Sequence, residues 1–315
     1  MARRVLVTGG AGFIGSHIIE AYLAAGWDVT ALDDLSRGKA SQVPNGVPLI
    51  VADIRSDLAR ATVATGGFEV LNHHAAQIDV RYSVERPSAD ADINIAGFVN
   101  MLEGAAAGGV RRVVFASSGG VVYGDPDVIP TPESAPKRPV SPYGVSKLVG
   151  EHYLRALGDL HGFQGVALRY ANVCGPRQDP KSEAGVVSIF VSRLLAGQPL
   201  SVFGDGTQTR DYVSVRDVAR ANVLASSVAL PTGVDHDTRA FNIATGIERS
   251  VLELADAAGR VTGRKPELRM EAARPGEILR SALDVRKAAA VLGWRPEVTF
   301  DDGLAMLMDW FKTEG

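Results

Sequence analysis

Short apolar runs alternate with longer stretches rich in Ala and Leu through the first half of the chain. Helical composition and length mark stretches such as Ser16–Ala25 and Gly97–Ala107. The apolar runs between such stretches, each typical of a buried strand, are Val5–Val7, Val29–Leu32, Leu49–Val51, Val70–Leu71, Val113–Phe115 and Val166–Leu168. Strands that are almost continuously apolar and alternate with helices predict an α/β fold built on a doubly wound parallel sheet.

The alternation loosens after about residue 174, where turns rich in Gly and Pro become frequent. We therefore expect residues 1–174 to form the sheet domain and residues 175–315 to form a smaller α/β region that mainly binds substrate. Residues 213–245 are expected to return to the first domain, which makes the boundary interleaved.

The composition narrows the function classes. The chain has 315 residues, of which 46% are hydrophobic and 22% charged, as in an ordinary globular protein. Its net charge of −3 shows no excess of Lys and Arg, so we expect no nucleic-acid partner. The one cysteine, Cys174, excludes an internal disulfide and favours a reducing compartment. Since no apolar run suggests a signal peptide or a membrane span, a cytoplasmic protein without a membrane partner is expected.

A glycine-rich segment follows the first predicted strand and precedes a helical run from Ser16. Gly10, Gly12 and Gly15 satisfy the pattern G-x-G-x-x-G, and Gly9 adds a further glycine. Such glycines permit a tight turn and let the backbone approach a pyrophosphate, which the N-terminus of the following helix attracts. The segment predicts a dinucleotide site of the Rossmann type.

The ends of the next two strands carry carboxylates. Asp33 can accept both ribose hydroxyls of NAD and would repel the additional phosphate of NADP, although Arg37 keeps NADP open. Asp53 could accept the exocyclic amine of adenine while Ile54 packs on the ring, but a plain turn explains this pair almost as well. NAD is therefore the predicted cofactor.

Tyr143 and Lys147 form the candidate catalytic pair. Ser141 is typical of a helix N-cap and Pro142 of a first helical turn, so Tyr143 and Lys147 share a helix face. A phenol has an ordinary pKa of about 10, and a nearby ammonium lowers that pKa and favours the phenolate. Such a tyrosine can take a proton from a substrate hydroxyl. The alternative is an amphipathic helix with an exposed Lys and a half-buried Tyr.

Three motifs together resemble a known family. The glycine loop, the segment Phe115–Gly120 ahead of Tyr123 and the Tyr143-x-x-x-Lys147 pair are the pattern of the extended short-chain dehydrogenase/reductases. The resemblance covers essentially the whole chain and is greatest to the short bacterial and archaeal branch of the UDP-glucose 4-epimerases. It implies an NAD-dependent isomerase that inverts C4 of a UDP-linked hexose through a transient 4-keto sugar.

The resemblance also implies the site residues. Ser118, with Ser117 as the alternative, would bind the reacting sugar hydroxyl beside Tyr143 and Lys147, and Asn94 would brace the active-site backbone. The implied cofactor residues are Gly9, Gly12, Phe13, Ile14, Gly15, Asp33, Asp34, Ser36, Gly38, Asp53, Ile54, Ala75, Ala76, Gln77, Asn94, Ser117, Tyr143, Lys147 and Tyr170. His73 and His74 lie beside this loop, but the other histidines lack ligand spacing, so no metal is expected.

The second half supplies the implied nucleotide-sugar site. Arg210 and Arg274 would clamp the diphosphate, although pairing with Asp211 and Glu277 at the surface is the alternative for each. Residues 200–204 resemble an edge strand that pairs with uracil, and the position linked to sugar size falls near Ser281. The implied substrate residues are Ser118, Tyr143, Asn172, Val187, Leu200, Val202, Phe203, Arg210, Arg274 and Glu277.

Other functions stay open at this point. The sugar could be a UDP-N-acetylhexosamine, a UDP-uronate or a dTDP-sugar. A nucleotide-sugar dehydratase or reductase is a further alternative, but related dehydratases carry an Asp-Glu pair where this chain has Gly119 and Gly120, which disfavours water loss. A non-catalytic NAD-binding protein would not need Tyr143 and Lys147. The helical stretches at residues 97–107 and 146–157 are the expected face of a homodimer.

Overall fold

The computed structural model describes residues 2–180, 185–273 and 278–314. Its centre is a sheet of seven parallel strands in the order β11-β6-β5-β4-β1-β2-β3. The predicted doubly wound sheet is confirmed, and each of the six predicted apolar runs lies in one of the first six strands. The strands are β1 (Arg4–Thr8), β2 (Asp28–Asp33), β3 (Leu49–Val51), β4 (Val70–His73), β5 (Arg112–Ser118), β6 (Gln164–Tyr170) and β11 (Ala240–Ile243).

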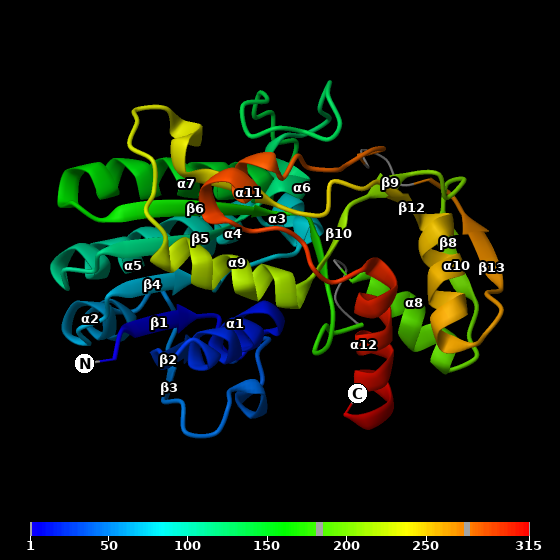
Figure 1. The fold of residues 1–315 in the computed structure, drawn as a ribbon, viewed down its shortest axis with the longest axis horizontal. Coiled ribbons are helices and arrows are strands. Elements are labelled where there is room, and N and C mark those ends of the chain that lie inside the picture. Colours follow the sequence, from blue (N-terminus) through cyan, green and yellow to red (C-terminus); the bar gives the residue numbers. More distant parts are fainter. Residues whose placement is uncertain (1, 181–184, 274–277, 315) are drawn as a thin grey trace.

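Helices cover both faces of this sheet (Figure 1). On one face, α1 (Phe13–Ala24), α9 (Val215–Ser227) and α11 (Arg286–Leu292) bury an apolar cluster with every second strand residue, such as Val5 and Val7. On the other face, α2 (Asp57–Thr65), α5 (Gly97–Ala107) and α7 (Pro142–His161) bury the alternate residues, such as Leu6 and Phe115. Burial of apolar side chains on both faces explains why the strands are almost continuously hydrophobic.

The strand order reverses beside β1, since the chain passes outward through β2 and β3 and then restarts at β4 on the other side. Loops that leave β1 and β4 therefore diverge at the carboxyl edge of the sheet and open a crevice between them. The register places Thr8 beside His73 at this edge. In the same way, Ser118 at the end of β5 lies beside Tyr170 at the end of β6.

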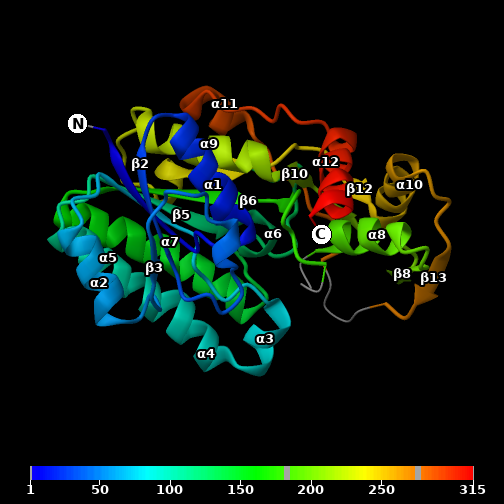
Figure 2. The same ribbon diagram turned by 90° about the horizontal axis from the view of Figure 1, so that it is seen from below.

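A smaller region packs beyond the carboxyl edge (Figures 1 and 2). Its apolar cluster joins α8 (Val186–Leu195), β8 (Leu200–Phe203), α10 (Val251–Thr262) and α12 (Phe300–Thr313). Strand β8 pairs in parallel with β13 (Leu268–Glu271). Because α9 and β11 lie between these elements in sequence and yet pack with the sheet, the chain crosses repeatedly between the two parts.

Short elements connect the two parts and surround the site. β7 (Asn172–Cys174) pairs in parallel with β10 (Tyr212–Ser214), and β9 (Thr209–Arg210) pairs antiparallel with β12 (Arg249–Ser250). The remaining helices are η1 (Ala40–Gln42), α3 (Val80–Glu85), α4 (Pro87–Ala91), the π-helical turn η2 (Asp92–Ala96), α6 (Gly119–Val122) and η3 (His236–Arg239). Among the described helices, none combines the length and apolar character that crossing a bilayer requires.

Candidate active site

Three glycines in and around the glycine loop lie too close to neighbouring atoms to carry a Cβ. Gly9 has a φ of +66°, and a Cβ there would lie 2.7 Å from the Ala75 nitrogen in the loop after β4. A Cβ on Gly15 would lie 2.1 Å from the Gly9 carbonyl oxygen. A Cβ on Gly38 would meet Ala11 at 2.9 Å. Glycine is thus required where the loop, helix α1 and the loop after β2 converge. Because a glycine carries no side chain, a ligand can approach the backbone there.

Helix α1 begins at Phe13, three residues earlier than the sequence indicated, because Gly12 is its N-cap. Phe13, Ile14 and Gly15 therefore form its first turn. Among the described residues no side chain caps this end, so the N–H groups of the turn can bind an anion. An uncapped helix start behind a glycine loop fits the pyrophosphate of a dinucleotide.

Asp33 closes one side of this cradle. Its carboxylate accepts hydrogen bonds from the Ala11 N–H at 3.0 Å and the Leu35 N–H at 2.8 Å. Burial raises the pKa of Asp33, and both backbone bonds oppose that effect. The carboxylate is therefore held at the end of β2 beside the glycine loop, as a ribose-binding group requires.

The neighbouring predicted residues make local contacts. Asp34 accepts from both the N–H and the hydroxyl of Ser36, which forms a tight turn. Asp53 accepts from the Arg55 N–H and pairs with its guanidinium, while Ile54 is 5% exposed and packs in the core. These contacts favour the turn interpretation for Asp53 and Ile54, and adenine contact stays a prediction.

Hydrogen bonds to the Thr8 hydroxyl hold the loop after β4 in place. This hydroxyl accepts from the N–H groups of His74 and Ala75, both at 3.2 Å, and pairs with the His73 ring at 2.9 Å. Burial lowers the pKa of His74 to about 3, so the imidazole is neutral. The His74 ring contacts the Tyr170 hydroxyl at 2.9 Å. Tyr170, a predicted cofactor residue, therefore uses its hydroxyl inside the protein.

Asn94 and Asp90 hold the last part of this loop. The Asn94 side chain accepts from the Gln77 N–H and donates to the Gln77 carbonyl, at 2.8 and 2.9 Å. Asp90, which is fully buried, accepts from the side chains of Gln77, Asn94 and Ser146. Asn94 thus braces backbone, as the resemblance implied, within a π-helical turn of a kind that is frequent at functional sites.

The candidate catalytic pair, Tyr143 and Lys147, lies on α7, which runs along β5 and β6. Ser141 caps this helix by accepting from the Gly144 N–H, and Pro142 is in its first turn, so the predicted start is confirmed. Lys147 is only 4% exposed, donates to the Ala116 carbonyl at 2.9 Å and lies 5.7 Å from the Tyr143 ring centroid. The burial of Lys147 contradicts the alternative of an exposed surface lysine.

The charge states of the pair differ from the simple expectation. Burial raises the pKa of Tyr143, and the Asp90 charge raises it further. Burial also lowers the pKa of Lys147 to about 8, although Asp90 opposes this change. The predicted lowering of the tyrosine pKa is therefore wrong for the protein alone, because loss of hydration and the Asp90 charge are what act on the phenol.

Ser117 and Ser118 are separated by their partners. Ser117 is 2% exposed, and its hydroxyl donates to Glu151 in the interior. Ser118 is half-buried at the end of β5, and no hydrogen bond joins its hydroxyl to any other described residue. This arrangement supports Ser118 rather than Ser117 as the residue that meets a ligand.

Some predicted substrate residues are partly exposed, and others have side chains in an apolar core. Asn172 is half-buried at the start of β7 and donates its backbone N–H to Asp211. Within the described chain β13 is the only strand that pairs with β8, and the Gln208 side chain donates to the Phe203 carbonyl at 2.9 Å. Three predicted residues, by contrast, have side chains in the core of the smaller region: Val187, Leu200 and Val202.

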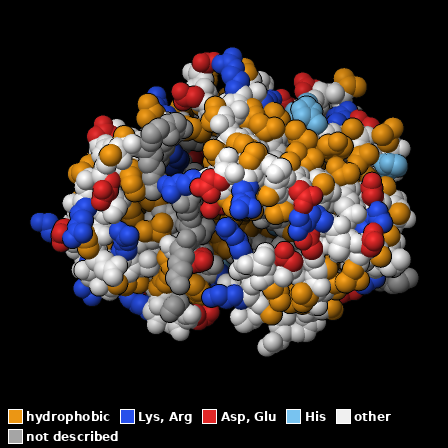
Figure 3. All heavy atoms as spheres, turned by 180° about the vertical axis from the view of Figure 1, so that it is seen from behind, with side chains coloured by type: hydrophobic (Ala, Val, Ile, Leu, Met, Phe, Trp, Pro, Cys, Tyr) orange, Lys and Arg blue, Asp and Glu red, His pale blue; other side chains and the backbone are white. Residues whose placement is uncertain are grey.

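The predicted arginine clamp is described only in part. Arg210 lies in β9 and donates to the Thr209 carbonyl at 2.8 Å. The neighbouring Asp211 is buried and accepts from Thr245 and Gly246, where burial raises its pKa. Arg274 and Glu277 lie outside the described residues. Figure 3 shows several Lys and Arg side chains, with Asp and Glu among them, on the face where the two parts of the molecule meet.

Sequence reasoning missed four buried residues that support the site. Asp90 lies four residues before Asn94, and Glu151 lies four after Lys147, so helical spacing was the available signal. Arg169 and Leu283 gave no such signal, because their contacts come from elements distant in sequence. The described residues contain no group of three or more His, Cys, Asp or Glu able to hold a metal ion.

Comparison with known proteins places the chain. Residues 5–244 match the model of the NAD dependent epimerase/dehydratase family. A UDP-glucose 4-epimerase of Mycolicibacterium smegmatis is 43% identical over 316 residues, which cover 99% of each chain. The structure of a Thermotoga maritima UDP-glucose 4-epimerase with UDP-glucose is similar at a TM-score of 0.93 and 40% identity, over 98% of each chain. A Thermus thermophilus UDP-glucose 4-epimerase in complex with NAD has a TM-score of 0.90 and 42% identity, over 99% of this chain and 100% of the other. The chain therefore belongs to the NAD dependent epimerase/dehydratase family.

Proposed function

We propose that this protein is a UDP-glucose 4-epimerase, which interconverts UDP-glucose and UDP-galactose with NAD as its cofactor. The observation that carries the proposal is the cluster at the carboxyl edge of the sheet, where Tyr143 and buried Lys147 lie on α7 beside the end of β5. Ser118 ends that strand with its hydroxyl available. Full-length relatives with this activity at 40–43% identity support the same assignment.

The residues divide the chemistry between them. When bound, NAD supplies the acceptor for hydride from C4 of the sugar and a positive ring that favours the tyrosine phenolate. Tyr143 then takes the proton of the 4-hydroxyl and later returns it. Ser118 hydrogen-bonds the same hydroxyl, while Lys147 contributes positive charge. Asn172 and Arg210 hold the nucleotide and leave the hexose free to turn.

One packing contact favours epimerisation of the sugar over its dehydration. Loss of water from the sugar needs an additional acid and base next to the reacting serine, where this chain has Gly119 and Gly120. A Cβ on Gly119 would lie 2.3 Å from a methyl carbon of Leu283. The space that an acidic side chain would need is filled by Leu283, and this favours an epimerase over a dehydratase.

Purified protein mixed with UDP-galactose, without added cofactor, is expected to form UDP-glucose up to a fixed ratio. Proton NMR of the anomeric region measures both sugars, and an acid extract of the protein gives its NAD content. Absence of conversion with NAD supplied would contradict the proposal. Parallel samples of a UDP-N-acetylhexosamine, a UDP-uronate and a dTDP-hexose would then identify an alternative substrate.

We also propose that the protein is a homodimer assembled through α5 and α7. A groove of about 700 Å³ lies beside these helices, and Ile95 of η2, Val99 of α5 and Tyr153 of α7 line it together with Arg55, Asp92 and Glu103. Apolar and aromatic side chains on a pair of adjacent helices suit a self-complementary two-fold contact.

Sedimentation should give twice the 33.3 kDa mass of one chain, and a Val99→Glu variant should sediment as a single chain. A wild-type protein that sediments as a single chain would contradict this assembly.

A further inference from the structure

One face of α7 carries a third residue in line with the catalytic pair. Tyr143, Lys147 and Glu151 follow one another at intervals of four residues, so their side chains share a face of the helix. Lys147 donates to the Ala116 carbonyl at 2.9 Å, and Glu151 accepts from the Ser117 hydroxyl. The helix that bears the base therefore holds two consecutive residues of β5, immediately before Ser118.

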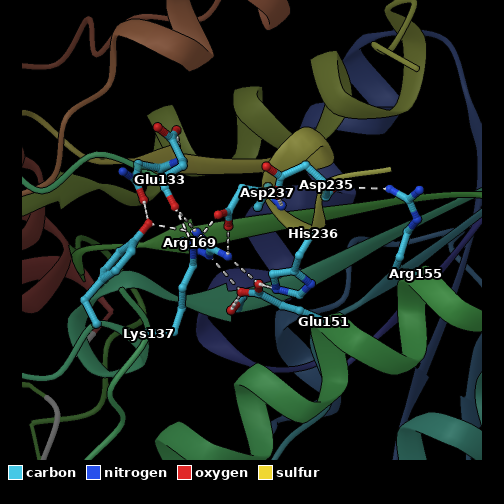
Figure 4. A network of polar contacts seen from close by, with 12 residues as sticks. Glu133, Lys137, Glu151, Arg155, Arg169, Asp235, His236 and Asp237 are labelled. Carbon is cyan, nitrogen blue, oxygen red and sulfur yellow. Dashed lines mark hydrogen bonds and ion pairs between the residues drawn. The ribbon is translucent and has the colours of Figure 1, made fainter. Parts of the chain in front are cut away.

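Arg169 keeps the Glu151 carboxylate in place (Figure 4). Its Nε and Nη2 donate to the two carboxylate oxygens at 3.0 and 2.6 Å, a bidentate arrangement with fixed geometry. Arg169 is the register partner of Ser117 across β5 and β6, and Ser117, Glu151 and Arg169 are all at most 3% exposed. Serine, carboxylate and guanidinium thus form a closed buried unit between two strands and α7.

Further hydrogen bonds and ion pairs hold this buried unit. Arg169 also donates to the Tyr123 hydroxyl at 2.9 Å and to Asp237 at 2.8 Å, while the His236 ring contacts Glu151 at 3.0 Å (Figure 4). Burial opposes ionisation of Glu151, but His236 and Arg169 outweigh it and lower its pKa to about 2. The carboxylate is therefore ionised at neutral pH and can only accept hydrogen bonds.

We propose that Glu151, held by Arg169, is a positioning residue that sets Ser118 relative to Tyr143. This inference rests on the proposed function, in which both residues meet the same sugar hydroxyl. The Ser118 hydroxyl has no hydrogen bond within the described residues, so its place depends on the backbone that precedes it. Glu151 fixes that backbone through Ser117 and belongs to the same helix as Tyr143.

A Ser117→Ala variant tests the proposal without breaking the buried ion pair. Loss of orientation is expected to lower kcat for UDP-galactose roughly ten- to a hundredfold and to leave KM within about twofold. Ser117→Thr keeps the hydroxyl and should restore most of kcat. Ser226→Ala is the matched control, because Ser226 is also 2% exposed and its hydroxyl contacts Tyr22 on the face of the sheet opposite α7.

Rates are measured per NAD-loaded site, together with Tm and a crystal structure of Ser117→Ala. A merely structural role would lower Tm in Ser117→Ala and Ser226→Ala alike and keep kcat per loaded site, and this result would overturn the proposal. Wild-type protein without turnover of UDP-galactose would contradict the proposed function alone. The crystal structure then decides the inference, since a displaced Ser118 hydroxyl supports it and an unchanged one refutes it.

Discussion

Replacing Tyr143 with phenylalanine is expected to lower kcat for UDP-galactose by roughly 10²–10⁴-fold, the range that general acid–base catalysis contributes. The phenylalanine keeps the aromatic ring and loses only the hydroxyl that exchanges the proton. Because the glycine loop and Asp33 are the proposed main anchors of the dinucleotide, NAD content should match that of the wild-type protein.

Initial rates by proton NMR, normalised to bound NAD, measure this effect. Tyr153→Phe is the matched control, because Tyr153 lies on the same helix, is 41% exposed and points away from the catalytic edge into the groove beside α5. It should keep its rate. A Tyr143→Phe protein with more than a tenth of the wild-type rate would exclude Tyr143 as the base of the reaction.

An Arg169→Met variant is expected to lose about 3–5 kcal/mol of unfolding free energy, because it leaves the Glu151 carboxylate buried without its main partner. That loss is a large part of the stability of a typical domain. Urea unfolding followed by circular dichroism measures the change. Arg60→Met removes an exposed ion pair with Asp57 and should cost only about 0–1 kcal/mol.

The pH dependence of stability provides an independent test. Glu151 has a pKa of about 2 in the folded protein against an ordinary value of 4.5. Since the folded value lies below the unfolded one, its stabilisation is present above about pH 4.5 and is lost as pH falls towards 2. Arg169→Met should flatten the stability profile across this window. An unchanged profile would show that Arg169 does not hold the charge of Glu151.

Local sequence features predicted the fold well because they act over short distances. Each strand of the first half is an apolar run, and the glycine loop, the Ser141 cap and the Tyr143–Lys147 spacing involve residues within one turn or loop. The helix start at Phe13 was placed late, because Gly12 caps the helix without a polar side chain. Such an end carries no signal of the usual kind.

Other parts of the site depend on contacts between distant segments, which a single sequence does not encode as a pattern. The pKa of Tyr143 follows from loss of hydration around the phenol and from Asp90, which comes from another helix. Arg169 meets Glu151 only because β6 lies under α7. Leu283 reaches Gly119 across more than half the chain. Such effects require the assembled fold.

The repeated passage of the chain between sheet and smaller region has a mechanical consequence. A single linker could act as a hinge and allow one part to swing open, but β7 with β10 and the segments around α9 and β11 tie the two parts at separate points. Large rigid-body opening would have to bend all of them together. An epimerase built in this way would have to turn its sugar without separating the two parts.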